Sequence, residues 1–170
     1  MIEVSTAELA DVAAAAVMRP VAADFTPVTP LTRRLAVAAG AAVEEQCAQL
    51  GDLPLGSAAI TGAGALPFAF MVHVAVRSVE EPVRPSTVRQ ALRNGFRRLA
   101  EWEIETVAMP LVGTGAGNLD AEEAVRIMLE VLDAHGTESS YPKLVKLVVD
   151  GSYEKLVVER ALSGADPVDG

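Results

Sequence analysis

The sequence predicts an α/β fold in which a largely parallel β-sheet is covered by helices on both faces. Three observations lead to this prediction. Short apolar runs alternate with segments of helical periodicity along the chain. Several of these runs are continuously apolar, as in strands that are buried on both faces. Glycine-rich turns follow two of the runs, which is typical of strand ends in such folds.

Length and composition limit the class of protein. The 170 residues are enough for one domain, expected over 1–163, with a frayed tail over 164–170. Apolar residues make up 51% of the chain, which excludes disorder, and aromatic residues only 4%, so we expect a core of Ala, Val and Leu. The net charge of −9 argues against nucleic acid as a partner, because such binding needs a basic surface.

Cysteine and histidine usage predicts neither a disulfide nor a metal site. Cys47 is the single cysteine, and the two histidines, His73 and His135, lie far apart in the sequence. No signal peptide and no membrane-spanning run is found, so we expect a cytoplasmic protein with no membrane partner. No cofactor is expected either.

The first half of the chain is expected to form three core strands and one helix after a short N-terminal strand. In order, these are strands at 2–5 and 13–18, a loop at 19–31, a helix from 32 to about 50, and strands at 56–60 and 68–76. The loop contains Pro20, Pro27 and Pro30, which make it stiff. The helix carries its apolar residues on one face and ends at Gly51.

The second half repeats the alternation of strand and helix. In order, we expect a helix at 85–103, a strand at 106–112, a glycine turn at 113–117, a helix at 120–135, a strand at 143–149 and a helix at 153–162. Pro85 and Ser86 begin the first of these helices, whose inner face includes Leu92 and Phe96.

The glycine turn is the most informative motif. Gly113, Gly115 and Gly117 stand between an apolar strand and a helix, where successive N–H groups and the positive end of the helix attract a phosphate. The motif is neither a Walker A loop, since no Gly-Lys-Ser/Thr follows, nor a Rossmann fingerprint, since Asn118 replaces the last glycine. The alternative is a turn that uses glycine for its geometry alone. We expect ligands to lie at the carboxyl ends of the strands, where the loops at 19–31, 61–67 and 113–119 would converge.

Three segments resemble the macrodomain family of ADP-ribose binders. They are Ala38–Cys47, Thr61–His73 and Pro110–Gly117, which stand in the order and spacing of the family. The resemblance extends from about residue 13 to 160. It implies a three-layer α/β/α sandwich with a mixed, mostly parallel sheet of about six strands, and ADP-ribose across the carboxyl ends of the strands. It also implies ligand contacts by Gly113, Thr114, Gly115, Ala116, Gly117 and Asn118, and by Thr61.

The chain departs from the family in its first loop. Met18-Arg19-Pro20-Val21 stands where the family usually has Asn-Ala-Ala-Asn, and residues 26–30 replace a run of glycines. In hydrolytic members this asparagine and these glycines position the distal ribose and a water. Pro27 and Pro30 also lack N–H donors. The departures therefore favour binding over catalysis.

Five further residues have competing interpretations. Arg19 is expected either to pair with a phosphate or to be an ordinary surface arginine. Asp24 is a candidate general base or ribose ligand, and otherwise stabilises a turn. Phe25 either stacks on the ligand or anchors the loop to the core. His73 is expected to be a buried structural histidine, and Cys47 is not expected to be a nucleophile.

The leading hypothesis is a divergent macrodomain that binds ADP-ribose, or a related nucleotide-diphosphate-sugar, without strong catalysis. One alternative is a hydrolase of ADP-ribosylated protein or of other ADP-ribose derivatives, with Asp24 as its base. The other is an assembly or regulatory module without a nucleotide site. The oligomeric state is left open.

Overall fold

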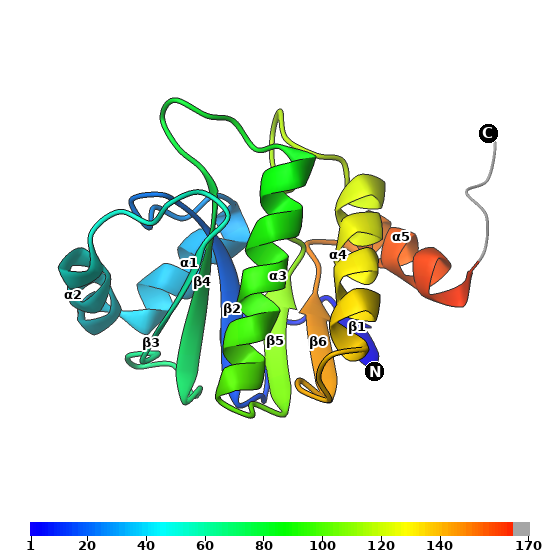
Figure 1. Ribbon diagram of the computed structural model, residues 1–170, viewed down its shortest axis with the longest axis horizontal. Coiled ribbons are helices and arrows are strands. Elements are labelled where there is room, and N and C mark those ends of the chain that lie inside the picture. Colours follow the sequence, from blue (N-terminus) through cyan, green and yellow to red (C-terminus); the bar gives the residue numbers. More distant parts are fainter. Residues whose placement is uncertain (165–170) are drawn as a thin grey trace.

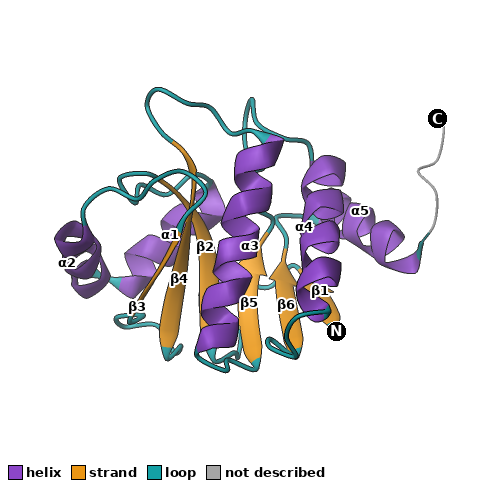
Figure 2. Ribbon diagram, viewed as in Figure 1, coloured by secondary structure: helices purple, strands orange, loops and turns teal. Residues whose placement is uncertain are grey.

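The computed structural model describes residues 1–164, in which a six-stranded sheet lies between two layers of helices (Figure 1, Figure 2). The strands are β1 (Ile2–Ser5), β2 (Ala16–Ala22), β3 (Ala58–Thr61), β4 (Phe70–Arg77), β5 (Thr106–Pro110) and β6 (Leu144–Val148). The helices are α1 (Pro30–Ala39), α2 (Ala41–Leu50), α3 (Pro85–Glu101), α4 (Ala121–Gly136) and α5 (Ser152–Ser163), with a 3-10 turn at Leu9–Asp11. The expected tail lies outside the described residues, apart from Gly164.

The sheet confirms the predicted mixed α/β architecture. Its strand order is β1-β6-β5-β2-β4-β3, and every neighbouring pair is parallel except β3 and β4. Strands β2 and β4 lie inside the sheet and are buried along nearly their whole length. This explains their largely apolar sequences, because both faces of each strand are covered, and Arg19 and His73 are the buried polar residues within them.

Each face of the sheet has its own hydrophobic core. Helices α3, α4 and α5 cover one face, and α1, α2 and the 3-10 turn cover the other. Figure 1 shows α3 and α4 in front of the sheet and α1 behind it. Helix α3 lies close to the sheet at Gly95, where a Cβ atom would stand 2.9 Å from both Met18 and Val74. No described helix has the length and apolar character that a membrane crossing needs.

Strand β2 runs further than the sequence predicts. The expected loop starts at Arg19, but β2 continues through Pro20 to Ala22. Strand β5 pairs with β2 at Ala16 and Val17, so within residues 1–164 Arg19 and Pro20 have a ladder partner only in β4, and Val21 forms an isolated bridge with Pro27. A strand edge without a ladder partner is where a residue without an N–H is tolerated. Arg19 thereby becomes a strand residue.

The single helix expected from residue 32 to 50 is two helices. Gly40 separates α1 from α2 with φ of 85°, a left-handed conformation that ends one helix and begins the next. The first helix also begins earlier, at Pro30, which occupies the first turn where proline is well tolerated.

The direction of β3 corrects the predicted convergence of loops. Because β3 is antiparallel to β4, the segment after Thr61 leaves the sheet at the amino ends of the parallel strands. There it packs on the α1–α2 junction, where the N–H of Ala65 donates to the carbonyl of Ala39 at 3.0 Å. Of the three loops that were expected to converge at the carboxyl edge, the loops after β2 and β5 therefore lie there and the loop after β3 does not.

Candidate functional site

The glycine loop connects β5 to α4 at the carboxyl edge of the sheet. Gly113, Gly115 and Gly117 have φ of 99°, 126° and 78°, conformations that side chains rarely adopt. The N–H of Leu119 donates to the carbonyl of Gly113 at 3.0 Å, which closes the loop. Asp120 then caps α4 by accepting from the N–H of Glu123 at 2.8 Å.

Backbone amides in this loop are left free. Within residues 1–164, the N–H groups of Thr114, Gly115, Ala116 and Gly117 donate to no backbone or side-chain acceptor. Loop N–H groups of this kind form a concave donor surface suited to an anion. The loop therefore presents four N–H donors at the carboxyl edge of the sheet, and its binding of a phosphate stays a prediction.

A narrow crevice separates this loop from the start of α1. Thr114 and Gly115 line one side, and residues 29–31 line the other. The crevice has a volume of about 100 Å³, below the roughly 300–1,000 Å³ of small-molecule sites. Asp150 and Glu154 also line it, and the N–H of Asp150 donates to the carboxylate of Glu154 at 2.8 Å.

The end of the segment 23–29 lies beside the glycine loop, and Thr29 lines the crevice together with Pro30 and Leu31 of α1. Val28 is buried in the core, and a Cβ atom on Gly115 would lie 3.6 Å from the Val28 carbonyl oxygen. Thr29 fixes the end of the segment through a capping box with Thr32, in which the N–H of each residue donates to the side chain of the other. The segment therefore lies against the glycine loop.

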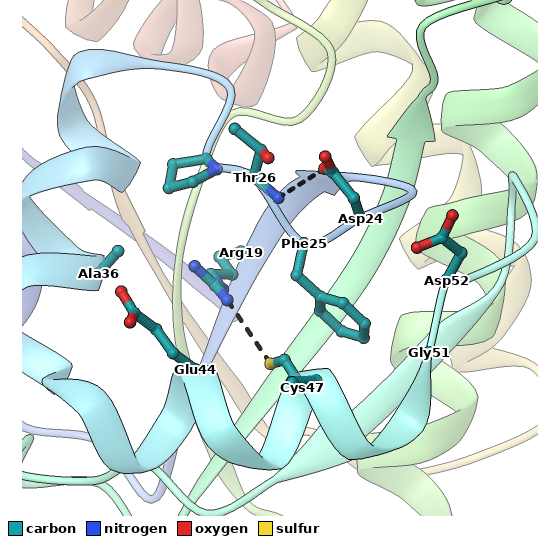
Figure 3. Close-up of a pocket in the computed structure, with 11 residues that line it drawn as sticks. Arg19, Asp24, Phe25, Thr26, Ala36, Glu44, Cys47, Gly51 and Asp52 are labelled. Atoms are coloured by element: carbon teal, nitrogen blue, oxygen red, sulfur yellow. Dashed lines mark hydrogen bonds between the residues drawn. The ribbon is translucent and has the colours of Figure 1, made fainter.

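A second pocket lies on the other side of the same segment. It has a volume of about 370 Å³, and Figure 3 shows the side chains that line it. These residues are Arg19, Asp24, Phe25, Thr26, Pro27, Ala36, Glu44, Cys47, Ala48, Gly51 and Asp52. None of them lines the glycine crevice. We call this space the Arg19 pocket.

Arg19 belongs to a buried chain of hydrogen bonds. Its Nε–H donates to Nδ1 of His73 at 2.9 Å, which makes Nδ1 an acceptor and leaves the ring proton on Nε2. Nε2 lies 2.8 Å from the hydroxyl of Thr61, which itself donates to the carbonyl of Gly62. His73 is fully buried, and burial with the charge of Arg19 holds its pKa well below 6.5. The predicted structural role of His73 is confirmed.

Cys47 joins the same cluster, which the sequence did not predict. Its Sγ lies 3.9 Å from Nε2 of His73 and 4.0 Å from Nη2 of Arg19. Burial raises the pKa of the thiol, although the charge of Arg19 opposes the rise. The thiol is therefore neutral at neutral pH. Cys47 is 28 positions from Arg19 and 26 positions from His73 in the sequence. The sequence feature that the three residues share is a polar side chain at an inward-facing position of an otherwise apolar strand or helix.

The loop residues take their places around the Arg19 pocket. Asp24 accepts from the N–H of Thr26 at 3.0 Å, as a turn-stabilising residue would, and its hydrogen bonds to Thr26 lower its pKa. Phe25 is buried and packs edge-on against the His73 ring with centroids 5.3 Å apart, so it anchors the loop to the core. Its φ of 69° is unusual for a bulky residue. Arg19 is not a surface arginine, because only 4% of it is exposed.

Among the predicted ligand-binding residues, the structure therefore brings together two separate sets. Residues 113–118 form the glycine loop at the carboxyl edge. Arg19, Phe25 and Asp24 surround the Arg19 pocket, and Thr61 lies beneath it at the far end of the hydrogen-bond chain. No predicted residue from the second set lines the glycine crevice.

Comparisons with known proteins agree on one family. The Macro domain model matches residues 30–128. The whole chain is 29% identical to an uncharacterized protein of Aeropyrum pernix, of which it covers 89%. It is 30% identical over 132 residues to the O-acetyl-ADP-ribose deacetylase of Shigella flexneri. The matched residues make up 74% of this chain and 75% of that enzyme.

A solved structure gives the same answer for the fold. The macrodomain of Trypanosoma brucei in complex with ADP-ribose superposes with a TM-score of 0.85 at 17% identity. The match covers 95% of this chain and 68% of that one. With the family model matched over more than half of its length and the strand order of its mixed sheet in place, this chain belongs to the macro domain family.

Proposed function

We propose that this protein binds ADP-ribose, or a related nucleotide-diphosphate-sugar, with the diphosphate against the glycine loop. The observation that carries the proposal is the run of free N–H groups from Thr114 to Gly117 at the carboxyl edge of the sheet. Four donors with no acceptor among residues 1–164 are suited to the oxygens of a diphosphate. The ADP-ribose in the Trypanosoma brucei macrodomain supports the choice of ligand.

The narrow crevice sets a condition on this binding. A ligand of this size does not fit in about 100 Å³, so the segment 23–29 has to move away from the glycine loop. Binding therefore includes the cost of that displacement, which lowers the apparent affinity. Asp150 and Glu154 add electrostatic repulsion to a diphosphate.

Calorimetric titration with ADP-ribose, ADP and AMP tests the proposal. ADP-ribose should bind, and Ala116→Glu should abolish the binding, because it places a carboxylate beside the free amides without straining the backbone. Ala41→Glu, an equal charge change at the exposed start of α2, is the matched control and should bind like wild type. Glu154→Gln should tighten binding about threefold or more by removing a repulsive charge. Absence of sub-millimolar binding for all three ligands would overturn the proposal.

One observation favours a second candidate, a module that keeps the fold without a nucleotide site. Val28 is packed into the core beside the glycine loop, as expected if the segment 23–29 permanently closes the crevice. The same titration separates the two, because a permanently closed crevice gives no heat with any of the three ligands and no change for Glu154→Gln.

The hydrolytic alternative is supported by the name of the Shigella flexneri relative. Asp24 lines the Arg19 pocket rather than the glycine crevice, and its lowered pKa makes it a weaker base. Release of acetate from O-acetyl-ADP-ribose, compared between wild type and Asp24→Ala, is the direct measurement. Turnover that disappears in this variant would establish the enzyme and the role of Asp24.

A further inference from the structure

The Arg19 pocket contains a buried cation without a buried anion. Only 4% of Arg19 is exposed, and no carboxylate of residues 1–164 lies within ion-pair distance of its guanidinium. Its hydrogen-bond partners in the described chain are His73 and Cys47. An arginine remains protonated even where burial lowers its pKa. A buried charge without a counter-charge is costly, so a ligand anion at this position would be strongly favoured.

The neighbours of Arg19 do not neutralise it. The pKa of His73 is lowered and that of Cys47 is raised, so imidazole and thiol are both uncharged at neutral pH. The charge of Glu44 opposes the lowering of the Arg19 pKa, and Glu44 forms no ion pair with Arg19 among residues 1–164. The guanidinium therefore presents one positive charge at the inner end of the pocket.

Two carboxylates lie at the outer part of the pocket, where the charge of Arg77 also acts on Asp24. Asp24 and Asp52 line it, and Figure 3 shows their carboxylates at the end away from the guanidinium and from Glu44. The ring of Phe25 lies between the two ends. Three carboxylates around one guanidinium disfavour a phosphate or another multiply charged anion. They favour a molecule that combines a single anionic group with a cationic one.

We propose that the Arg19 pocket binds a small amino carboxylate, with its carboxylate on Arg19 and its ammonium group toward Asp24 and Asp52. The planar guanidinium is suited to a carboxylate, which it can hold with two parallel hydrogen bonds. The methylene groups of the ligand lie against Phe25. A volume of about 370 Å³ suits a small molecule. This site shares no lining residue with the glycine crevice and does not depend on nucleotide binding.

A series of ω-amino acids is the probe. Glycine, β-alanine, 4-aminobutyrate and 6-aminohexanoate differ in the distance between carboxylate and ammonium, and acetate and methylamine each carry one of the two charges. Thermal melting at equal millimolar concentrations should show stabilisation by at least one amino acid and none by acetate or methylamine. The amino acid that stabilises most is then titrated by calorimetry.

Variants place the binding in this pocket. Arg19→Met should abolish it, and Arg33→Met, on an exposed position of α1, is the matched control. The doubly substituted Asp24→Asn/Asp52→Asn protein should bind about tenfold more weakly, and Glu44→Gln about threefold more tightly. Asp24, Asp52 and Glu44 are exposed, so their substitutions, here called the carboxylate variants, test the proposal even if Arg19→Met does not fold. Three results would each overturn the proposal. They are no stabilisation by any amino acid, equal stabilisation by acetate, and unchanged affinity in the carboxylate variants.

Discussion

Arg19 and His73 lie directly opposite each other on neighbouring parallel strands, and the Nε–H of Arg19 donates to Nδ1 of His73 at 2.9 Å. This one bond selects the tautomer of the imidazole and keeps it uncharged. A proton on Nδ1 would face the N–H of a cation in a buried site. The pair therefore makes the stability of the protein depend on pH.

The free energy of unfolding should fall as the pH falls below about 6.5. In the unfolded chain a histidine takes up a proton near pH 6.5, whereas native His73, whose pKa is lowered, stays neutral. The unfolded state then binds more protons, which costs stability by up to about 1.4 kcal/mol per pH unit. Urea denaturation between about pH 5.5 and 7 measures the slope. His73→Asn keeps an acceptor for Arg19 but does not titrate, so its slope should be shallower; equal slopes would contradict the assignment.

Thr61→Val should destabilise the protein by about 1–3 kcal/mol, because it leaves the Nε2–H of buried His73 without its hydroxyl acceptor. Thr61→Ser keeps the hydroxyl and should cost much less. Chemical denaturation compares the two. The affinity for ADP-ribose should be the same in both variants, since Thr61 is at the far edge of the sheet from the glycine loop. Loss of that affinity in Thr61→Val alone would give Thr61 the ligand-binding role that the sequence predicts.

Gly113→Ala should lower stability by about 1–3 kcal/mol. The position has φ of 99°, and the added Cβ would lie 2.8 Å from a methyl carbon of Val88 in α3. Gly136→Ala is the matched control. It lies at the end of α4 with open space around it and an ordinary φ, so alanine there should be neutral or stabilise by up to about 1 kcal/mol. Similar melting temperatures for the two variants would show that the glycine loop is not strained by a side chain.

Thr29→Ala should destabilise the protein by about 1 kcal/mol, because it removes the side-chain half of the capping box at the start of α1. Thr29→Ser retains the hydroxyl and should be close to wild type. The same substitution weakens the hold on segment 23–29, so proteolysis within that segment should be faster in Thr29→Ala. Unchanged proteolysis would mean that Val28 and Phe25 alone fix the segment.

The sequence predicts the core elements of the fold well, because strands that are buried on both faces have mostly apolar sequences, interrupted in β2 by Arg19 and in β4 by His73. It does not predict the direction of β3, since a short strand has the same local pattern in either direction. It also does not predict the end of β2, because Pro20 breaks most strands and its tolerance here depends on the missing β5 partner.

The glycine loop and the Arg19 pocket also differ in how well the sequence predicts them. The glycine loop is contiguous, so its geometry follows from five neighbouring residues and their φ values. The Arg19 pocket joins β2, α2 and β4, and only the strand register brings Arg19 opposite His73. Because side chains alternate between the two faces of a strand, Arg19 and His73 both lie on the face covered by α1 and α2. This proximity can be predicted only when the pairing of β2 with β4 is known.

The segment 23–29 forms a partition between two compartments. Thr29 belongs to the glycine crevice and Asp24 to Pro27 belong to the Arg19 pocket. A displacement of the segment that changed both spaces would couple the two proposed sites, and thermodynamic linkage would make the effect reciprocal and equal in both directions. Two chemically unrelated ligands would in this way sense each other's occupancy without ever touching.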